Sequence, residues 1–183
     1  EALGEVVGRS DLRRRPVTLT EALSFTRRRD PYEWQQALRR ECGATGGRGV
    51  SCVPMMESEA WQLVQEYESA SVSSISTLMA LFESLMPLDG PKSIVFISSG
   101  LFSEQRGRLR ELGVKAAESG VSLYALQLDP PMVNDASRTT RVNIFKDQGL
   151  LSEGLDVITA LSKGKVFRMI GDGERAFERI ARE

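Results

Sequence analysis

The feature that most constrains the fold is a set of three short apolar segments, separated by helix-like segments, in the second half of the chain. Residues 93–98 read SIVFIS, residues 121–128 read VSLYALQL and residues 165–170 read KVFRMI. Short segments rich in β-branched and aromatic residues predict strands. Helical patterns at about 103–119 and 152–162 predict the crossovers that join parallel strands. We therefore expect an α/β fold with a parallel, Rossmann-like sheet, in which the first two strands are buried on both faces.

Helix signals dominate the first half of the chain. Thr18 or Thr20 is placed to cap a helix that includes Glu21. Asp30 followed by Pro31 is a stronger start signal, because proline is favoured at the first helical position. The sequence thus predicts two short helices before the first cysteine.

A long helix is expected from about residue 57 to residue 86. Its apolar residues recur mostly at three- and four-residue spacing, which predicts one buried stripe: Trp61, Val64, Ile75, Leu78, Phe82 and Leu85. The middle of this helix, SASVSSIS, is built of small residues that would let another element pack closely. We expect residues 1–54 to form an irregular segment with short helices, and residues 55–183 to form the α/β part of the same domain.

Charge and composition exclude several functional classes. The chain has 24 Lys+Arg and 25 Asp+Glu and a net charge of −1, so no strong field favours nucleic acid or an anionic membrane. No apolar run approaches the length of about 20 residues that spans a bilayer. Histidine is absent, which excludes Ser-His-Asp and Cys-His nucleophile systems and any histidine-containing metal site within this chain.

Cys42 and Cys52 are the only cysteines, and the segment between them is rich in glycine. Two thiols cannot form a tetrahedral zinc site by themselves, and the spacing is not C-x-x-C. Two unrelated buried thiols would fit a cytosolic protein, whereas a disulfide would fit an exported one. We favour the disulfide, and with it an extracytoplasmic location, because the small residues between the cysteines make ring closure easy.

Several segments after residue 87 carry a family resemblance: GPKSIVFISSGL, RELGVKAAESGVSLYALQLD and GLDVITALSKGKVFRMIGDGERAFERIARE. They resemble the later part of a von Willebrand factor A-type domain and, more narrowly, the VWFA-related domains of exported Acidobacteria proteins. Upstream, VTLTEALSF, RREC and the long helix resemble the insertion that those relatives carry before the strand at 93–98. The resemblance covers most of the chain from about Val17, through hydrophobic patterning and glycines.

The resemblance implies a doubly wound α/β sheet, usually six-stranded, with the family's first strand near its centre. This sequence starts after the family's first three strands, so the resemblance implies an incomplete domain with a helical insertion. In such a domain the strand at 93–98 has an open edge, which is an aggregation liability unless something covers it.

Metal-binding members of the family hold a hard cation such as Mg²⁺ through a D-x-S-x-S loop, a threonine and an aspartate after the fourth strand. The first-strand motif is absent here, and Ser99 stands where the aspartate is expected. A hydroxyl is a weaker ligand than a carboxylate, so the resemblance implies a degenerate or absent metal site and no cofactor. The stretch from Asp135 to Thr139 fits D-x-S-x-T, but it follows Pro130-Pro131 in a polar loop and is not expected to bind a metal.

Ser98, Ser99 and Gly100 follow the first strand, and Asp129 follows the second. Ligands bind at the carboxyl ends of strands in open α/β sheets, which makes these four residues the candidate ligand face. We favour a structural role for the serines, in which they end the strand and satisfy donors of the next helix. The alternative is a polar corner of a protein-binding face that a long loop at 129–149 would extend.

The leading functional hypothesis is a non-enzymatic protein-interaction module of von Willebrand factor A type, with an unidentified protein partner and no nucleic acid. The main alternative is a hydrolytic enzyme that uses Ser99 or Asp129 at the strand-end crevice. Against it, G-x-S-x-G is not formed and no histidine can activate a serine. A third hypothesis is a purely structural domain.

Overall fold

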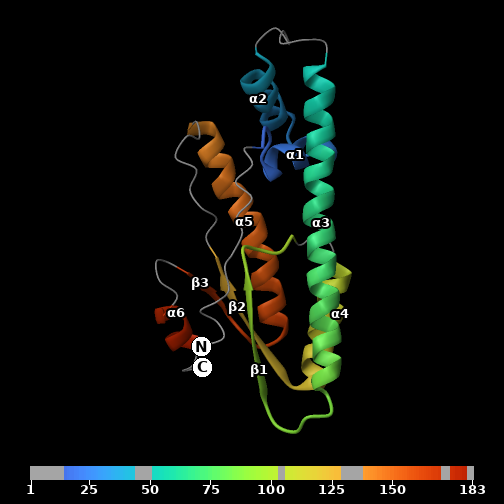
Figure 1. Ribbon diagram of the computed structural model, residues 1–183, viewed down its shortest axis with the longest axis vertical. Helices are drawn as coiled ribbons and strands as arrows, with labels where there is room; N and C mark the ends of the chain where they lie inside the picture. Colours follow the sequence, from blue (N-terminus) through green and yellow to red (C-terminus); the bar gives the residue numbers. More distant parts are fainter. Residues whose placement is uncertain (1–14, 44–50, 103–105, 129–137, 170–173, 181–183) are drawn as a thin grey trace, which may run out of the picture.

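A computed structural model describes residues 15–43, 51–102, 106–128, 138–169 and 174–180 of the chain. The elements follow in the order α1 (Leu19–Thr26), α2 (Pro31–Cys42), α3 (Cys52–Leu85), β1 (Lys92–Ser98), α4 (Arg106–Ser119), β2 (Val121–Gln127), α5 (Arg138–Leu161), β3 (Val166–Arg168) and α6 (Glu174–Ile180). Figure 1 shows the molecule as elongated, with α1 and α2 at one end and the sheet at the other. The fold is mixed α/β, as predicted.

The three strands form one parallel sheet in the order β1-β2-β3. β1 pairs with β2 over its whole length, from Lys92 opposite Val121 to Ser98 opposite Gln127. This confirms the predicted parallel sheet, and three parallel strands with helices between them are compatible with a Rossmann-like fold. Within the described part of the chain β1 lies at one edge of the sheet, and its far side has no strand partner.

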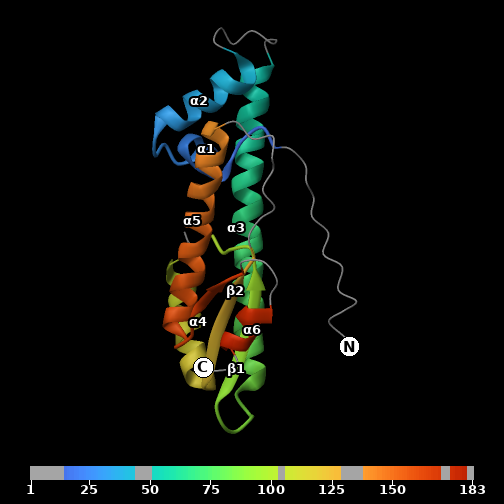
Figure 2. The ribbon, with the colours of Figure 1, turned by 90° about the vertical axis from the view of Figure 1, so that its left-hand side faces the viewer.

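α3 connects the two ends of the molecule. It has 34 residues, so it is about 50 Å long, and Figures 1 and 2 show it running beside the helical end and then beside the sheet. Its first half packs with α1 and α2 in one apolar core. Its second half contributes Ile75, Leu78 and Phe82 to a second core, with α4, α5 and the sheet.

One residue of the predicted stripe of α3 lies outside the core. Trp61 is 46% exposed, whereas Ala60 and Val64 beside it are fully buried. The prediction of a buried Trp61 was therefore wrong, because the helix turns its smaller neighbour Ala60 towards α1. The indole still makes an edge contact with Phe25, with ring centroids 6.4 Å apart.

The predicted caps of the two short helices are confirmed. Thr18 accepts a hydrogen bond from the backbone N–H of Glu21, and the Glu21 carboxylate accepts one from the Thr18 N–H, which completes a capping box. Asp30 caps α2 by accepting a hydrogen bond from the Tyr32 N–H, and Pro31 is the first helical residue. Cys42 at the end of α2 and Cys52 at the start of α3 form a disulfide, with Cα atoms 5.9 Å apart.

The helix that precedes β3 is twice as long as predicted. Residues 138–149, predicted to lie in a long loop, form the first half of α5, so the prediction of a helix limited to 152–162 was wrong. The segment contains mediocre helix formers such as Asn143 and Asp147. Both side chains hydrogen-bond to α1, and this tertiary contact stabilises a helix that the local sequence does not favour.

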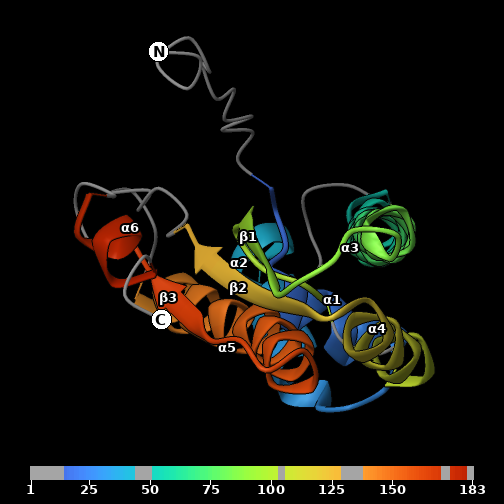
Figure 3. The ribbon, with the colours of Figure 1, turned by 90° about the horizontal axis from the view of Figure 1, so that it is seen from below.

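β1 is buried less than predicted. Ile94 and Phe96 pack on the core that lies under α4 and α5, but Val95 and Ile97 on the opposite face are 37% and 50% exposed. The prediction that this strand is buried on both faces was therefore wrong, whereas β2 is buried on both faces, as predicted. Figure 3 shows the reason: α4 and α5 cover one face of the sheet, and α6 lies beside β3, far from β1.

Candidate functional site

The strand-end residues predicted as a ligand face are held by local hydrogen bonds. β1 ends at Ser98. The Ser98 hydroxyl donates to the Gly100 carbonyl at 2.9 Å and accepts from the Gly100 N–H at 3.1 Å. Its hydrogen-bonding capacity is thus used within the turn, which is the arrangement expected of a residue that terminates a strand.

The backbone N–H groups after the turn donate hydrogen bonds to two helices. The Leu101 N–H donates to the Leu151 carbonyl of α5 at 3.0 Å. The Phe102 N–H donates to the Ser71 hydroxyl of α3 at 2.9 Å, in a buried position. Ser71 belongs to the serine-rich stretch of α3, so a small residue there does let another segment approach closely, as the sequence suggested.

Gly100 allows α5 to approach the turn. A Cβ atom at this position would lie 2.3 Å from the Leu151 Cβ, closer than real Cβ contacts allow. Gly154, one turn further along α5, faces the same turn, and a Cβ there would lie 2.0 Å from the Leu101 carbonyl oxygen. Gly100 on one side of this interface and Gly154 on the other thus allow the close distance between α5 and the end of β1.

A buried glutamine, which the sequence reading missed, lies at the end of β2. Gln127 is 4% exposed. Its side-chain N–H group donates to the Ser99 carbonyl at 3.5 Å, and its oxygen accepts from the Ser152 hydroxyl at 2.8 Å. The polar Gln127 within the apolar segment VSLYALQL was the available signal. These bonds join the residue after β1, the end of β2 and α5, and they satisfy both polar groups of the buried Gln127 side chain.

The described residues that directly follow β1 offer hydroxyl oxygens rather than carboxylates. The Ser98 hydroxyl is engaged by Gly100, and Ser99 offers a single hydroxyl. Across the described ranges, no group of three or more Cys, Asp or Glu side chains is arranged to hold a metal ion. Asp129 and the stretch from Asp135 to Ser137 lie outside the described residues, so their place relative to Ser98 is not defined.

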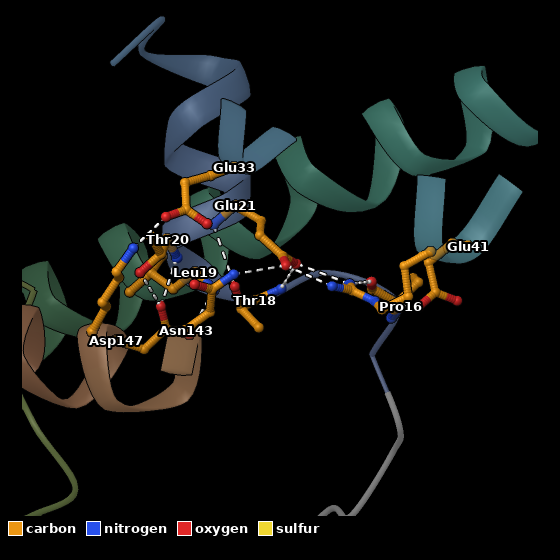
Figure 4. A network of polar contacts seen from close by, with 11 residues as sticks. Pro16, Thr18, Leu19, Thr20, Glu21, Glu33, Glu41, Asn143 and Asp147 are labelled. Atoms are coloured by element: carbon orange, nitrogen blue, oxygen red, sulfur yellow. Dashed lines mark hydrogen bonds and ion pairs between the residues drawn. The ribbon is translucent and has the colours of Figure 1, made fainter. Parts of the chain in front are cut away.

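A second polar cluster joins α1, α2 and α5, and Figure 4 shows it from close by. Its centre is Glu21, a fully buried residue of α1. The Arg40 guanidinium of α2 donates to both Glu21 carboxylate oxygens, at 2.7 and 3.0 Å. The Asn143 amide of α5 donates to the same carboxylate at 2.9 Å. One buried charge of α1 is thus bound by two other helices, α2 and α5.

Asp147 binds the start of α1. Its carboxylate accepts hydrogen bonds from the Leu19 N–H at 2.8 Å and the Thr20 N–H at 2.6 Å, and a further one from the Thr20 hydroxyl. The first N–H groups of a helix have no partner within the helix and favour a negative charge. Asp147 and the Thr18 cap together satisfy the N–H groups at the start of α1.

The pKa values of the two carboxyl groups are shifted in opposite directions. Burial raises the pKa of Asp147 to about 6, although the hydrogen bonds from Thr20 and Leu19 act against it. Burial also disfavours ionisation of Glu21, but the hydrogen bonds from Arg40, Thr18 and Asn143 outweigh it and hold the pKa of Glu21 below its ordinary value. Glu21 therefore stays ionised at neutral pH beside Arg40, whereas Asp147 titrates at a pH of about 6.

An open cleft of about 340 Å³ lies beside this cluster, lined by Thr20, Leu23, Ser24, Arg29, Asp30, Glu33, Lys146 and Leu150. The Lys146 ammonium and the Glu33 carboxylate on its wall form an ion pair that ties α5 to α2. The charges of these two side chains therefore compensate each other. Asn143, Lys146 and Asp147 lie three and four residues apart, so they share one face of α5. A prediction of a helix at residues 138–149 would therefore have indicated that these three side chains lie together.

None of the described helices is long and apolar enough to cross a membrane. Comparison of the chain with models of known protein families, with curated proteins and with solved structures gives no match.

Proposed function

We propose that this chain is a non-enzymatic protein-interaction module of von Willebrand factor A type, with a degenerate metal site, that binds an extended segment of a protein along β1. The observation that carries this proposal is the edge of β1, which has no strand partner among the described residues, beside two exposed apolar side chains, Val95 and Ile97. An edge strand with free backbone groups is a template for pairing with another chain.

The apolar face to which Val95 and Ile97 belong continues across the whole sheet. Val95 lies opposite Tyr124, Ile97 lies opposite Leu126, and Leu126 lies opposite Phe167. Residues opposite one another in a parallel pair point to the same face, so these side chains form one continuous apolar surface.

Exposure on this face rises towards β1. Phe167 and Leu126 are 4% and 1% exposed, and Tyr124 is 9% exposed, against 37% for Val95 and 50% for Ile97. The β3 side is covered by Ile180 of α6, and the Arg179 guanidinium lies over the Phe167 ring, 5.2 Å from its centroid. Exposed apolar side chains that continue a buried surface are a recurring mark of a protein-binding site.

The contacts at the strand ends support a non-enzymatic role. A serine nucleophile needs a base within hydrogen-bond reach; the chain has no histidine, and the hydroxyl of Ser98, the neighbour of Ser99, is bonded to the backbone of Gly100. A fluorophosphonate probe, which labels activated serines, separates the alternatives. We expect no labelling, and stoichiometric labelling of Ser99 would establish the hydrolytic alternative.

The disulfide between Cys42 and Cys52 supports an extracytoplasmic location, since such bonds persist in oxidising compartments. The lack of a carboxylate at Ser99 supports a degenerate metal site. Calorimetric titration with Mg²⁺ tests the second point: we expect no binding heat at micromolar affinity. Binding at that affinity would contradict this part of the proposal.

The binding proposal is tested with two surface variants of the immobilised protein. Val95→Lys/Ile97→Lys places charges along the open edge of β1, whereas Phe145→Lys changes a residue of α5 that is 56% exposed and lies outside the sheet. We expect proteins captured from an extract by the wild type to be retained by Phe145→Lys and lost by the β1 double variant. Circular dichroism serves to show that both variants keep the fold.

Capture that is equal for the wild type and the β1 double variant would refute the β1 edge as the binding surface. Loss of capture in both variants would refute it as well, because the effect would then not depend on the strand.

A further inference from the structure

We propose that the strand which pairs with β1 is β1 of a second copy of this chain, arranged antiparallel about a two-fold axis that passes through Val95. This inference rests on the proposed function, because it names the partner at the same edge. The pairing would join two three-stranded sheets into one continuous sheet.

The outward-facing backbone groups of β1 can be identified from its bonds to β2. The Lys92 N–H donates to the Gly120 carbonyl, and the Ser98 carbonyl accepts from the Leu128 N–H. In a parallel strand the N–H and C=O of one residue point to the same side, and the side alternates along the strand. Residues 92, 94, 96 and 98 therefore face β2, and the N–H and C=O groups of 93, 95 and 97 face away from it.

The two edges of the sheet are not equivalent, and this favours pairing of β1 with itself. A β1-to-β3 contact between copies would propagate into an open chain of molecules, as heterologous contacts do. However, β3 has three residues, against seven in β1, and α6 packs on it through Ile180. A β1-to-β1 contact uses the same long edge on both copies and closes as a dimer.

Charge sets the direction of the pairing. Lys92 is the one charged residue of β1 and lies at its amino end. Parallel pairing of two copies would place the two lysines side by side, which is destabilising. Antiparallel pairing places them at opposite ends of the new ladder, about 20 Å apart.

The outward-facing groups also set the register. An antiparallel ladder needs residues 93, 95 and 97 of one copy to lie opposite residues of the same set in the other copy. Centring the pair on Val95 matches 93 with 97, 95 with 95 and 97 with 93, which gives about six hydrogen bonds. A shift by two residues in either direction leaves two matched pairs within the strand and about four hydrogen bonds.

This register makes a sharp prediction for cysteine crosslinking. Two residues at position 95 would have Cα atoms about 5.5 Å apart, within the range that a disulfide bridges. Two residues at position 97 would be offset by four residues, about 13 Å, which is too far. Val95→Cys and Ile97→Cys are therefore a matched pair, since both side chains lie on the same face of the same strand and both are exposed.

The experiment measures mass and crosslinking of the full chain at tens of micromolar. Light scattering should give twice the 20.2 kDa mass of one chain for the wild type and for Phe145→Lys, and the single mass for Val95→Lys/Ile97→Lys. Mild oxidation should convert most of Val95→Cys to a covalent dimer, with at least about tenfold less conversion for Ile97→Cys.

A wild type of single mass would overturn the inference, and so would equal crosslinking of the two cysteine variants. The mass and the capture measurements together distinguish failure of this inference from failure of the proposed function. If the wild type has single mass but captures a different protein through Val95 and Ile97, the second copy is excluded and the interaction edge stands. If the wild type has single mass and capture does not depend on these residues, both proposals fail.

Discussion

The carboxylate of Asp147 on α5 accepts a hydrogen bond from the backbone N–H of Thr20 on α1, across 127 positions of sequence. This bond joins the helical end of the molecule to the helix that packs on the sheet. The same face of α5 binds Glu21 through Asn143 and Glu33 through Lys146. The attachment of α1 and α2 to the α/β part therefore depends on charged and polar groups in addition to the apolar core.

Replacing Asp147 by Asn is expected to change how stability depends on pH. The pKa of Asp147 is raised to about 6 from an ordinary 3.8, so its protonated form stabilises the fold below pH 4, and this contribution is lost as the pH rises through 6. A shift of about two pKa units is worth at most about 3 kcal/mol. Between pH 4 and pH 7, the free energy of unfolding of the wild type minus that of Asp147→Asn should fall by about 1–3 kcal/mol.

Urea unfolding at several pH values provides the measurement for Asp147, and comparison of two proteins at each pH cancels the contributions that they share. Asp156→Asn, at an exposed position of the same helix, serves as the control and should track the wild type. A difference between wild type and Asp147→Asn that stays constant from pH 4 to pH 7 would disprove the assigned role.

Removal of Arg40 is expected to destabilise the fold strongly. Arg40→Met leaves the carboxylate of the fully buried Glu21 without its cation, which costs about 3–5 kcal/mol. Glu21→Gln should cost less, since the Arg40 side chain is 22% exposed and can be solvated. The double variant should lose less than the sum of the two single losses, as coupled residues do.

The exposed ion pair of Arg15 and Glu66 serves as the control for the stability changes expected at Glu21 and Arg40. Both side chains are more than 40% exposed, so Arg15→Met should cost at most about 1 kcal/mol. Chemical unfolding gives all of these values. Additive losses at Glu21 and Arg40, or a loss at Arg40 no larger than that at Arg15, would contradict the assignment of a buried ion pair.

Two glycines of α5 are expected to respond in opposite ways to the same substitution. Gly154→Ala introduces a Cβ atom 2.0 Å from the Leu101 carbonyl oxygen, so the end of β1 must shift away from α5. Such overpacking typically costs about 1–3 kcal/mol. Gly149→Ala meets no atom within 4 Å and should stabilise the helix by about 0.5–1 kcal/mol. Thermal unfolding of both variants tests the packing, and equal effects of the same sign would show that α5 does not approach the turn as described.

Loss of the disulfide should lower stability by about 2–3 kcal/mol, because the bond closes a short loop in the unfolded chain. For a chain of this length, that corresponds to a melting temperature lower by about 5–10 °C. The Cys42→Ala/Cys52→Ala variant and the wild type in reducing agent should both show it. Insensitivity of the wild-type melting temperature to reductant would argue against the bond in solution.

Local signals predicted the elements that depend on neighbouring residues. The capping box of Thr18 and Glu21, the start of α2 at Asp30 and the three strands were all readable, because each signal lies within a few residues of its effect. The first half of α5 was not readable. Asn143 and Asp147 favour a helix there only because α1, more than 100 positions earlier, supplies their partners.

The candidate surface shows the same division. The sequence by itself determined that an apolar, β-branched strand follows residue 91 and that Ser98 ends it. Both the propensity for a strand and the signal that ends a strand depend on neighbouring residues only. Only the tertiary structure decided that Ile94 and Phe96 face the core while Val95 and Ile97 remain exposed. Exposure depends on which helices cover which face of the sheet, and the positions of α4, α5 and α6 follow from contacts between distant segments of the chain.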